Sequence, residues 1–149
     1  MNLLTKKFDL TIDYSRSLQE MISAGNYGWV NNDITKKHFP LLTEFNNKKV
    51  KILFKLFTFN HSISSENVIS KMNKAGYRPA TLVELLALGE FYPELQKEFS
   101  VVALNSLWRV SRNFYFVPVL GFGDDGRVLD LDWLDSDWHK LSCFLAVCR

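Results

Sequence analysis

The stretch RVLDLDWLDSDW, residues 127–138, decides how this fold is read. Its residues alternate between an apolar set and a mixed set: Leu129, Leu131 and Trp133 against Val128, Asp130, Asp132 and Leu134. Period-two alternation predicts a half-buried strand, with the first set in the core and the second facing solvent. A solvent-facing set that combines acids with apolar side chains needs an explanation, which the rest of the chain has to supply.

Composition predicts one folded domain without a strongly charged partner. The chain has 149 residues, of which 47% are hydrophobic and 14% aromatic, enough for a substantial core. A net charge of +2 is too small to predict binding to nucleic acid or to an anionic membrane. No run approaches the roughly 20 apolar residues of a membrane span, and residues 1–8 lack the apolar segment of a secretory signal. The default expectation is therefore a cytoplasmic protein.

Two cysteines, Cys143 and Cys148, lie near the end of the chain. Their spacing fits no metal motif, and two ligands do not close a zinc site. We expect free thiols, and the alternative is a disulfide within one short strand. We expect neither a metal nor another cofactor.

The first two-thirds of the chain predicts alternating strands and helices. Residues 8–13 and 50–59 have strand character, and three helix starts carry N-cap signals. Ser17 with Glu20, and Thr81 with Glu84, form capping boxes, and Ser64 is a third N-cap. Gly25, Gly76 and Gly89 are the expected helix ends, and Pro93 is expected to begin one further turn.

From residue 100 onward the helical periodicity ends, and short β-like runs alternate with turns rich in Gly and Asp. Such a tail needs the helices to cover it, so we predict one α+β domain over residues 1–149. Residues 1–104 are the expected scaffold, and residues 105–149 are the expected ligand-displaying region.

The acidic residues divide unevenly along the chain. Every Glu lies at or before Glu98, and only Asp occurs after it. Asp suits turns, but it is depleted in strands, so turn preference does not explain Asp130 and Asp132. A codon that ends in C and has random bases at its first two positions can encode Asp, His, Phe, Leu, Val, Ser or Cys. It cannot encode Glu, Gln, Met, Lys or Trp.

This bias accompanies a set of residues that we call the skeleton: Trp108, Val117, Pro118, Leu120, Gly121, Arg127, Leu129, Leu131, Trp133, Trp138, Phe144, Leu145, Ala146 and Val147. The pattern resembles the variable region of proteins diversified by diversity-generating retroelements, in which a reverse transcriptase copies a template with errors at adenines. GYRPATLVELLAL, residues 76–88, also resembles the helix before the lectin-like core of related proteins, so the resemblance covers residues 60–149. The chain departs from the family pattern at Asn105, Tyr115, Lys140 and Cys143.

The resemblance implies a C-type lectin fold, a compact mixed β-core flanked by two helices, related to the domain of formylglycine-generating enzymes. It implies a binding protein rather than an enzyme, whose C-terminal surface is diversified to bind a protein or other macromolecular ligand. Phe114, Phe116 and Phe122 would be its energetic anchors. The full expected ligand-binding set is Arg109, Ser111, Arg112, Phe114, Phe116, Val119, Phe122, Asp124, Asp125, Val128, Asp130, Asp132, Leu134, Asp135, Ser136, His139, Leu141 and Ser142.

Other interpretations rank lower. A calcium-dependent carbohydrate-binding lectin would need six to eight converging oxygens, and no such motif is visible. A cysteine oxidase is disfavoured because Cys143 and Cys148 would point to opposite faces of one strand. His139 has no nucleophile or metal ligand beside it in the sequence. Sugar stacking by tryptophans is disfavoured because Trp108, Trp133 and Trp138 are expected in the core. A plain interaction domain with an invariant tail stays open.

Overall fold

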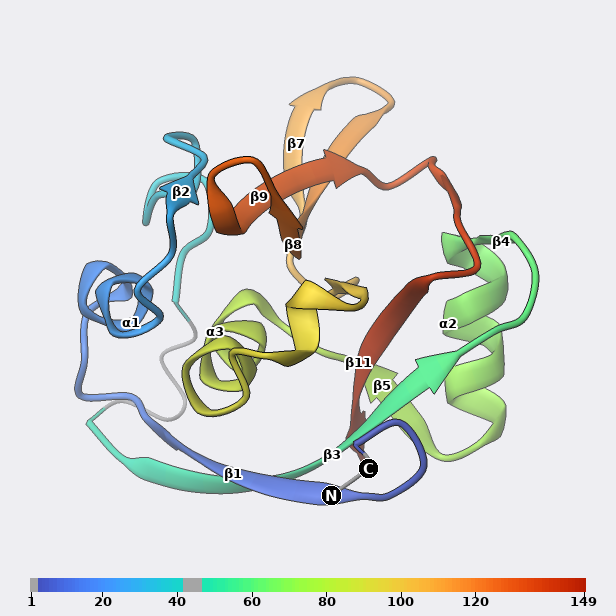
Figure 1. Cartoon of the computed structure of the whole chain (residues 1–149), viewed down its shortest axis with the longest axis horizontal. Helices are drawn as coiled ribbons and strands as arrows, with labels where there is room; N and C mark the ends of the chain where they lie inside the picture. The colour runs from blue at the N-terminus through green and yellow to red at the C-terminus, as the bar shows by residue number, and fades with distance from the viewer. Residues whose placement is uncertain (1–2, 42–46) are drawn as a thin grey trace.

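A computed structural model describes residues 3–41 and 47–149 (Figure 1). The helices are α1 (Leu18–Ala24), α2 (Ser65–Lys74), α3 (Leu82–Phe91) and the 3₁₀ turn η1 (Leu95–Lys97). The strands are β1 (Phe8–Asp13), β2 (Trp29–Val30), β3 (Lys49–Thr58), β4 (Ile63–Ser64), β5 (Tyr77–Pro79), β6 (Ser100–Val102), β7 (Trp108–Ser111), β8 (Phe114–Gly123), β9 (Gly126–Trp133), β10 (Asp137–Trp138) and β11 (Ser142–Cys148).

One large sheet organises the molecule, in the order β1-β3-β11-β6-β8-β9-β2. β5 adds to β11 and β7 adds to β8, while β10 and β4 form a separate two-stranded ribbon. β11 lies in the middle of the sheet, antiparallel to β3 and parallel to β6. The sheet curls around α3, with α1 and α2 on opposite sides of the molecule (Figure 1).

The predicted α+β class is confirmed: a large mixed sheet packs with three α-helices in the described part of the chain. The predicted helix starts are also confirmed. Ser17 and Thr81 each accept from the N3 backbone in a capping box, and the Ser64 side chain accepts from the Asn67 N–H. Gly76 follows α2 with φ +86°, the left-handed conformation that glycine adopts without strain.

The predicted end of α3 at Gly89 is wrong. The helix continues to Phe91, and Gly89 lies inside it. A Cβ added at Gly89 would overlap the Tyr27 hydroxyl. The glycine is therefore needed for close packing against Tyr27 and does not mark the end of the helix.

Both faces of the sheet are covered, and each covering has its own apolar cluster. The main core lies between the sheet and α1 and α3, and includes Leu85, Leu120 and Leu129. The second cluster, which we call the α2 core, includes Met72 of α2 with Val117 and Phe144 of the sheet.

This double covering corrects two expected display positions. Val119 is buried in the α2 core, on the face opposite Leu120 of the main core. Ser142 is buried at the start of β11, where it pairs with Ser100 of β6. Period-two alternation cannot separate core from surface where both faces of a strand are buried.

The core assignment of Trp133 is also wrong. Leu129 is buried and Leu131 is half-buried, but Trp133 is 43% exposed. The three side chains do share a face, as predicted. β9 runs past the edge of the core before it ends, so the last side chain of the apolar set emerges from it. Of the other two skeleton tryptophans, Trp138 is buried and Trp108 is half-buried.

Both cysteines are free thiols, as predicted. Cys143 belongs to the main core, whereas Cys148 packs against the α2 core, so the two lie on opposite faces of β11. Burial raises the pKa of Cys143 to about 12. A thiol held protonated in this way is a poor nucleophile.

Candidate ligand-binding face

Five rings form a continuous row across neighbouring segments at one end of the sheet. We call this the aromatic row, and it comprises His38, Trp108, Phe116, Trp133 and Phe114 in spatial order. His38 stacks on Trp108 with ring centroids 3.8 Å apart, and Phe116 stacks on Trp133 at 4.1 Å. Trp108 and Phe116 lie 5.6 Å apart, and Phe114 meets the edge of Trp133 at 5.5 Å.

Strand register places these rings on one face. Phe116 of β8 lies opposite both Trp108 of β7 and Trp133 of β9. Directly opposed residues in an antiparallel pair share a face, with Cβ atoms about 4.5–5.5 Å apart, which suits ring stacking. Trp108 also packs against the main core, which supports the inner end of the row.

The outer end of the aromatic row is open to solvent. Phe114 is 54% exposed, and Trp133 is 43% exposed. Leu107 and Val110 beside Trp108 are also exposed. Grouped exposed apolar side chains held on strands are typical of a binding surface.

The hairpin of β7 and β8 carries this open end away from the body of the molecule (Figure 1). Its tip is polar and basic, with Arg109, Arg112 and Asn113 all exposed. Arg109 Nη2 donates to the Arg112 carbonyl at 3.3 Å, and the strand register shifts between Arg109 and Ser111. A register shift of this kind increases local twist and discourages pairing at the open edge of β7.

The other predicted ligand residues lie around the row rather than on a single face. The exposed ones are Arg109, Ser111, Arg112, Phe114, Phe122, Asp124, Asp125, Asp132, Asp135, His139 and Leu141. The half-buried ones are Phe116, Val128, Asp130, Leu134 and Ser136, and Val119 and Ser142 are buried as described above. Phe122 lies at the far end of β8, six residues from Phe116, which is about 20 Å along a strand.

Asp130 and Asp132 lie on the opposite face of β9 from Trp133. Asp130 accepts from Asn31 Nδ2 at 3.0 Å and from the Leu131 N–H at 2.7 Å. Asp132 accepts from the Trp133 N–H at 2.8 Å and from Ser136 Oγ at 3.3 Å. Asp132 is exposed and its partners are local, so it can contact a ligand, whereas Asp130 is half-buried and fastens the segment after β2.

The segment after β9 is fastened to α2. Ser65 Oγ donates to the Leu134 carbonyl at 2.6 Å and accepts from Trp138 Nε1 at 2.8 Å. A cavity of 420 Å³ lies beside this contact and is lined in part by Asp135 and Ser136. The predicted residues of this segment are therefore held in place near the row rather than carried on a free loop.

Sequence reasoning missed three parts of this face. His38 was not selected, Trp133 was assigned to the core and Trp108 to the core alone, and Leu107 and Val110 were not selected. The alternation from Leu129 to Trp133 does indicate a shared face. It does not indicate where the core beneath that face ends, because other segments set that limit.

The groups with catalytic potential are dispersed. Nδ1 of His38 is 2.7 Å from the Asp33 carbonyl, and the ring is stacked in the row. Nδ1 of His139 is bonded to the Leu141 N–H at 3.1 Å. In the described part of the chain, no three His, Cys, Asp or Glu side chains are grouped to hold a metal ion. No helix in residues 3–41 and 47–149 is long and apolar enough to cross a membrane.

Comparison with protein-family models, curated proteins and solved structures finds no significant match to this chain.

Proposed function

We propose that this protein is a binding module that holds a protein or other macromolecular ligand on the aromatic row and the surrounding hairpin. The single observation that carries the proposal is the open end of the row, where Phe114 and Trp133 expose about half of their side chains. Aromatic side chains bury a large area at low entropic cost, so they are frequent anchors of interfaces. They stand on paired strands and need little ordering on binding.

We further propose a C-type lectin fold whose C-terminal surface is diversified by a retroelement. Burial supports a division between fixed and free positions. Val117, Leu120 and Leu129 of the proposed fixed skeleton are buried, as is the segment 144–147. All proposed free positions except Val119 and Ser142 are exposed or half-buried. Trp133 is the fixed residue that reaches the surface, so it would serve as a constant anchor among changing neighbours.

Two matched libraries test the binding face. One randomises Val110, Ser111, Arg112 and Asn113, four exposed positions on the hairpin that carries the open end of the row. The control randomises four equally exposed positions on the β1–β3 edge, Asp9, Thr11, Lys49 and Lys51. Both are displayed on yeast and selected against the same panel of unrelated proteins. We expect binders from the first library only.

The selected binders are then measured with the row altered. Trp133→Ala should weaken their binding by about tenfold or more, as loss of an aromatic anchor does. An unchanged melting temperature would show that this variant is folded. Equal yields from the two libraries, or binders indifferent to Trp133→Ala, would refute the proposed face.

Diversification is tested separately by sequencing the 3′ end of the gene across the source population. Variation should concentrate at codons such as those for Asp130, Asp132 and His139, while Leu129 and Trp133 stay constant. An invariant tail would reject the retroelement and leave a fixed interaction domain.

A further inference from the structure

A second concave feature adjoins the inner end of the aromatic row. This pocket has a volume of 210 Å³ and lies where α3 begins, between the segment 38–41 and the segment 105–107. Two residues link it to the row. His38 both lines the pocket and stacks on Trp108, and Leu107 lines it immediately before Trp108 in the chain. The pocket and the row therefore form one continuous surface.

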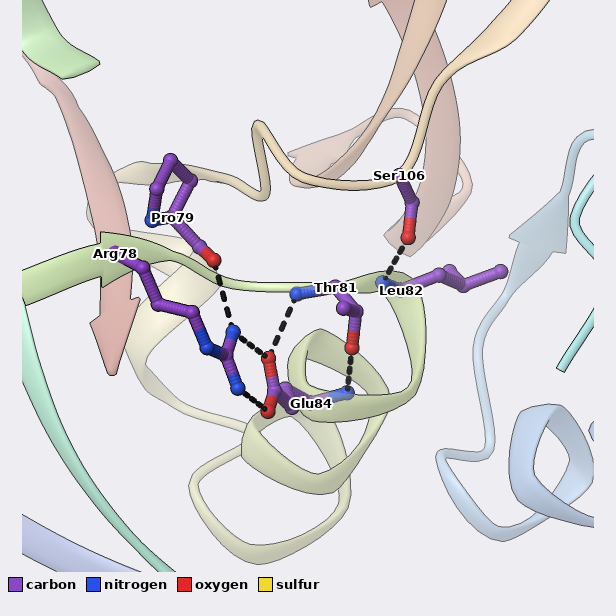
Figure 2. Close-up of polar contacts among 6 residues, drawn as sticks. All are labelled: Arg78, Pro79, Thr81, Leu82, Glu84 and Ser106. Carbon is purple, nitrogen blue, oxygen red and sulfur yellow. Dashed lines mark hydrogen bonds and ion pairs between the residues drawn. The ribbon is translucent and has the colours of Figure 1, made fainter. Parts of the chain in front are cut away.

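The frame of the pocket is held by a dense polar network (Figure 2). Arg78 forms a two-pronged ion pair with Glu84, with nitrogen–oxygen distances of 3.0 and 2.8 Å. Glu84 Oε1 also accepts from the Thr81 N–H at 2.8 Å. Ser106 Oγ accepts from the Leu82 N–H at 2.7 Å and so ties the segment 105–107 to the helix. The Asn105 N–H donates to the Ala80 carbonyl at 2.9 Å from the same segment.

These contacts make the pocket preformed. Hydrogen bonds tie the segment 105–107 to the start of α3, and the segment 38–41 is held beside it by the stack of His38 on Trp108, so a ligand would not have to order these segments. Preformed concave sites lose less free energy on binding than sites that must be assembled.

The described lining offers no ionic partner to a charged ligand. No Asp, Glu, Lys or Arg is among the described residues that line the pocket. The start of a helix attracts anions, but here the carboxylate of Glu84, which is buried, already occupies the positive end of α3. An ionic group in the pocket would lose its hydration without gaining a partner of opposite charge.

The lining instead suits a single uncharged ring. Tyr14, Phe39, Leu82 and Val83 supply apolar surface, and Ser106 adds a hydroxyl. An apolar cavity of about 150 Å³ is large enough to bind benzene. At 210 Å³ the pocket has room for one six-membered ring with a small substituent.

We propose that this pocket receives a phenylalanine or tyrosine side chain of the polypeptide that lies on the aromatic row. The inference rests on the proposed function and names the chemistry of the ligand: a protein segment with an uncharged aromatic residue at one end of its contact. Continuity through His38 and Leu107 allows one segment to cover the row and fill the pocket together.

The test uses N-acetyl-phenylalaninamide as a probe in NMR titrations of the whole chain, with N-acetyl-leucinamide as the comparison ligand. A single buried ring predicts a dissociation constant on the order of 1 mM. Amide shifts should move at Leu82, Val83, Ser106 and Leu107, and the leucine amide should bind several-fold more weakly.

Asn105→Trp places a large side chain at the pocket, where Asn105 is exposed. It should weaken binding of the phenylalanine amide by about tenfold or more, since its ring competes for the same space. Asn60→Trp, at an exposed position between β3 and β4 and outside both the pocket and the row, is the matched control and should bind the probe as the parent does.

Three results would overturn the pocket proposal: no saturable amide shifts, unchanged probe binding in Asn105→Trp, or amide shifts confined to Phe114 and Trp133. In the last case the proposed binding face would stand while the pocket proposal fails. If the library selection yielded no binders while the probe still shifted the pocket amides, the binding face would be refuted and the pocket would still bind an aromatic ring.

Discussion

Tyr27 is packed closely between two glycines. Cβ atoms added at Gly25 or Gly89 would overlap its ring or its hydroxyl. The guanidinium of Arg127 lies over the ring face, 4.9 Å from the centroid. The buried Oη has no hydrogen-bond partner in the described part of the chain. Burial raises the pKa of Tyr27 to about 12.

This geometry predicts a coupled pair of substitutions. Gly89→Ala should destabilise the protein by about 1–3 kcal/mol, because the added methyl group overlaps Tyr27 Oη. Tyr27→Phe alone should be neutral or stabilising, since it removes an unpaired buried hydroxyl. In the double variant, the cost of Gly89→Ala should fall by at least half. Equilibrium urea unfolding of the four proteins measures the coupling free energy, and simple additivity would contradict the overlap.

The thiol of Cys143 predicts a pH dependence of stability. Its folded pKa of about 12 lies above the ordinary value of 9.0, so the folded state keeps the proton that the unfolded state releases. Stability from this group is complete below pH 9 and is lost as pH rises toward 12. The unfolding free energy should fall less steeply between pH 9 and 10.5 in Cys143→Ala than in the parent. Parallel slopes would mean that the thiol is not held protonated.

Element boundaries could be predicted where one segment carries the signal. The capping boxes at Ser17 and Thr81 are local, since each side chain bonds within its own first turn, and they predicted the start of α1 and α3 correctly. Gly89 was misread because its role depends on Tyr27, 62 positions earlier in the chain. Trp133 was misread because the core beneath β9 ends before the strand does. Such errors are expected wherever distant segments decide burial.

Arg127 of β9 links its strand to α1, α3 and η1. It donates to the Gly25 carbonyl after α1 at 2.5 Å and to the Gly89 carbonyl of α3 at 2.6 Å. It also donates to Gln96 Oε1 at 2.9 Å, and Gln96 in turn donates to carbonyls of β8 and β9. The two backbone carbonyls lie toward the C-terminal ends of their helices, where a cation is favoured.

Arg127→Lys should therefore cost about 2–3 kcal/mol, because the three acceptors are spaced to match the separate nitrogens of a planar guanidinium, which a single ammonium nitrogen does not reproduce. Arg109→Lys on the exposed hairpin is the control, and it should change stability by less than about 0.5 kcal/mol. Chemical denaturation of the two variants measures the difference. Equal stabilities would show that the network around Gln96 holds without the guanidinium.

At the scale of the whole molecule, the order of strands in the sheet differs from their order in the chain. β11 comes last in the sequence, yet it pairs with β3, β5 and β6 and is buried on both faces. Sheet order could not be predicted from the sequence, because it depends on pairings between residues far apart. The apolar run 50–59 predicted a strand correctly, but it did not predict the partners of that strand.

Removal of residues 142–149 should unfold the whole chain and should not leave a shortened but folded protein. β3, β5 and β6 would each lose the pairing that β11 provides, and both apolar clusters would lose the side chains of β11. Removal of Arg149 alone is the control and should leave a folded protein. Near-UV circular dichroism and amide shift dispersion distinguish these outcomes, and a cooperative melt in the shortened chain would contradict the prediction.

The place of β11 has a consequence for how genetic variation in the preceding segment would be filtered. Every proposed variable position except Ser142 is encoded upstream of this strand. A stop codon or a reading-frame shift anywhere in residues 105–141 would delete or scramble the middle of the sheet. The damaged product could not fold and would be open to proteolysis, whereas an in-frame exchange at the surface would pass. The fold thus selects against truncated and frame-shifted products, because β11 must follow the varied segment intact before any new surface can be presented.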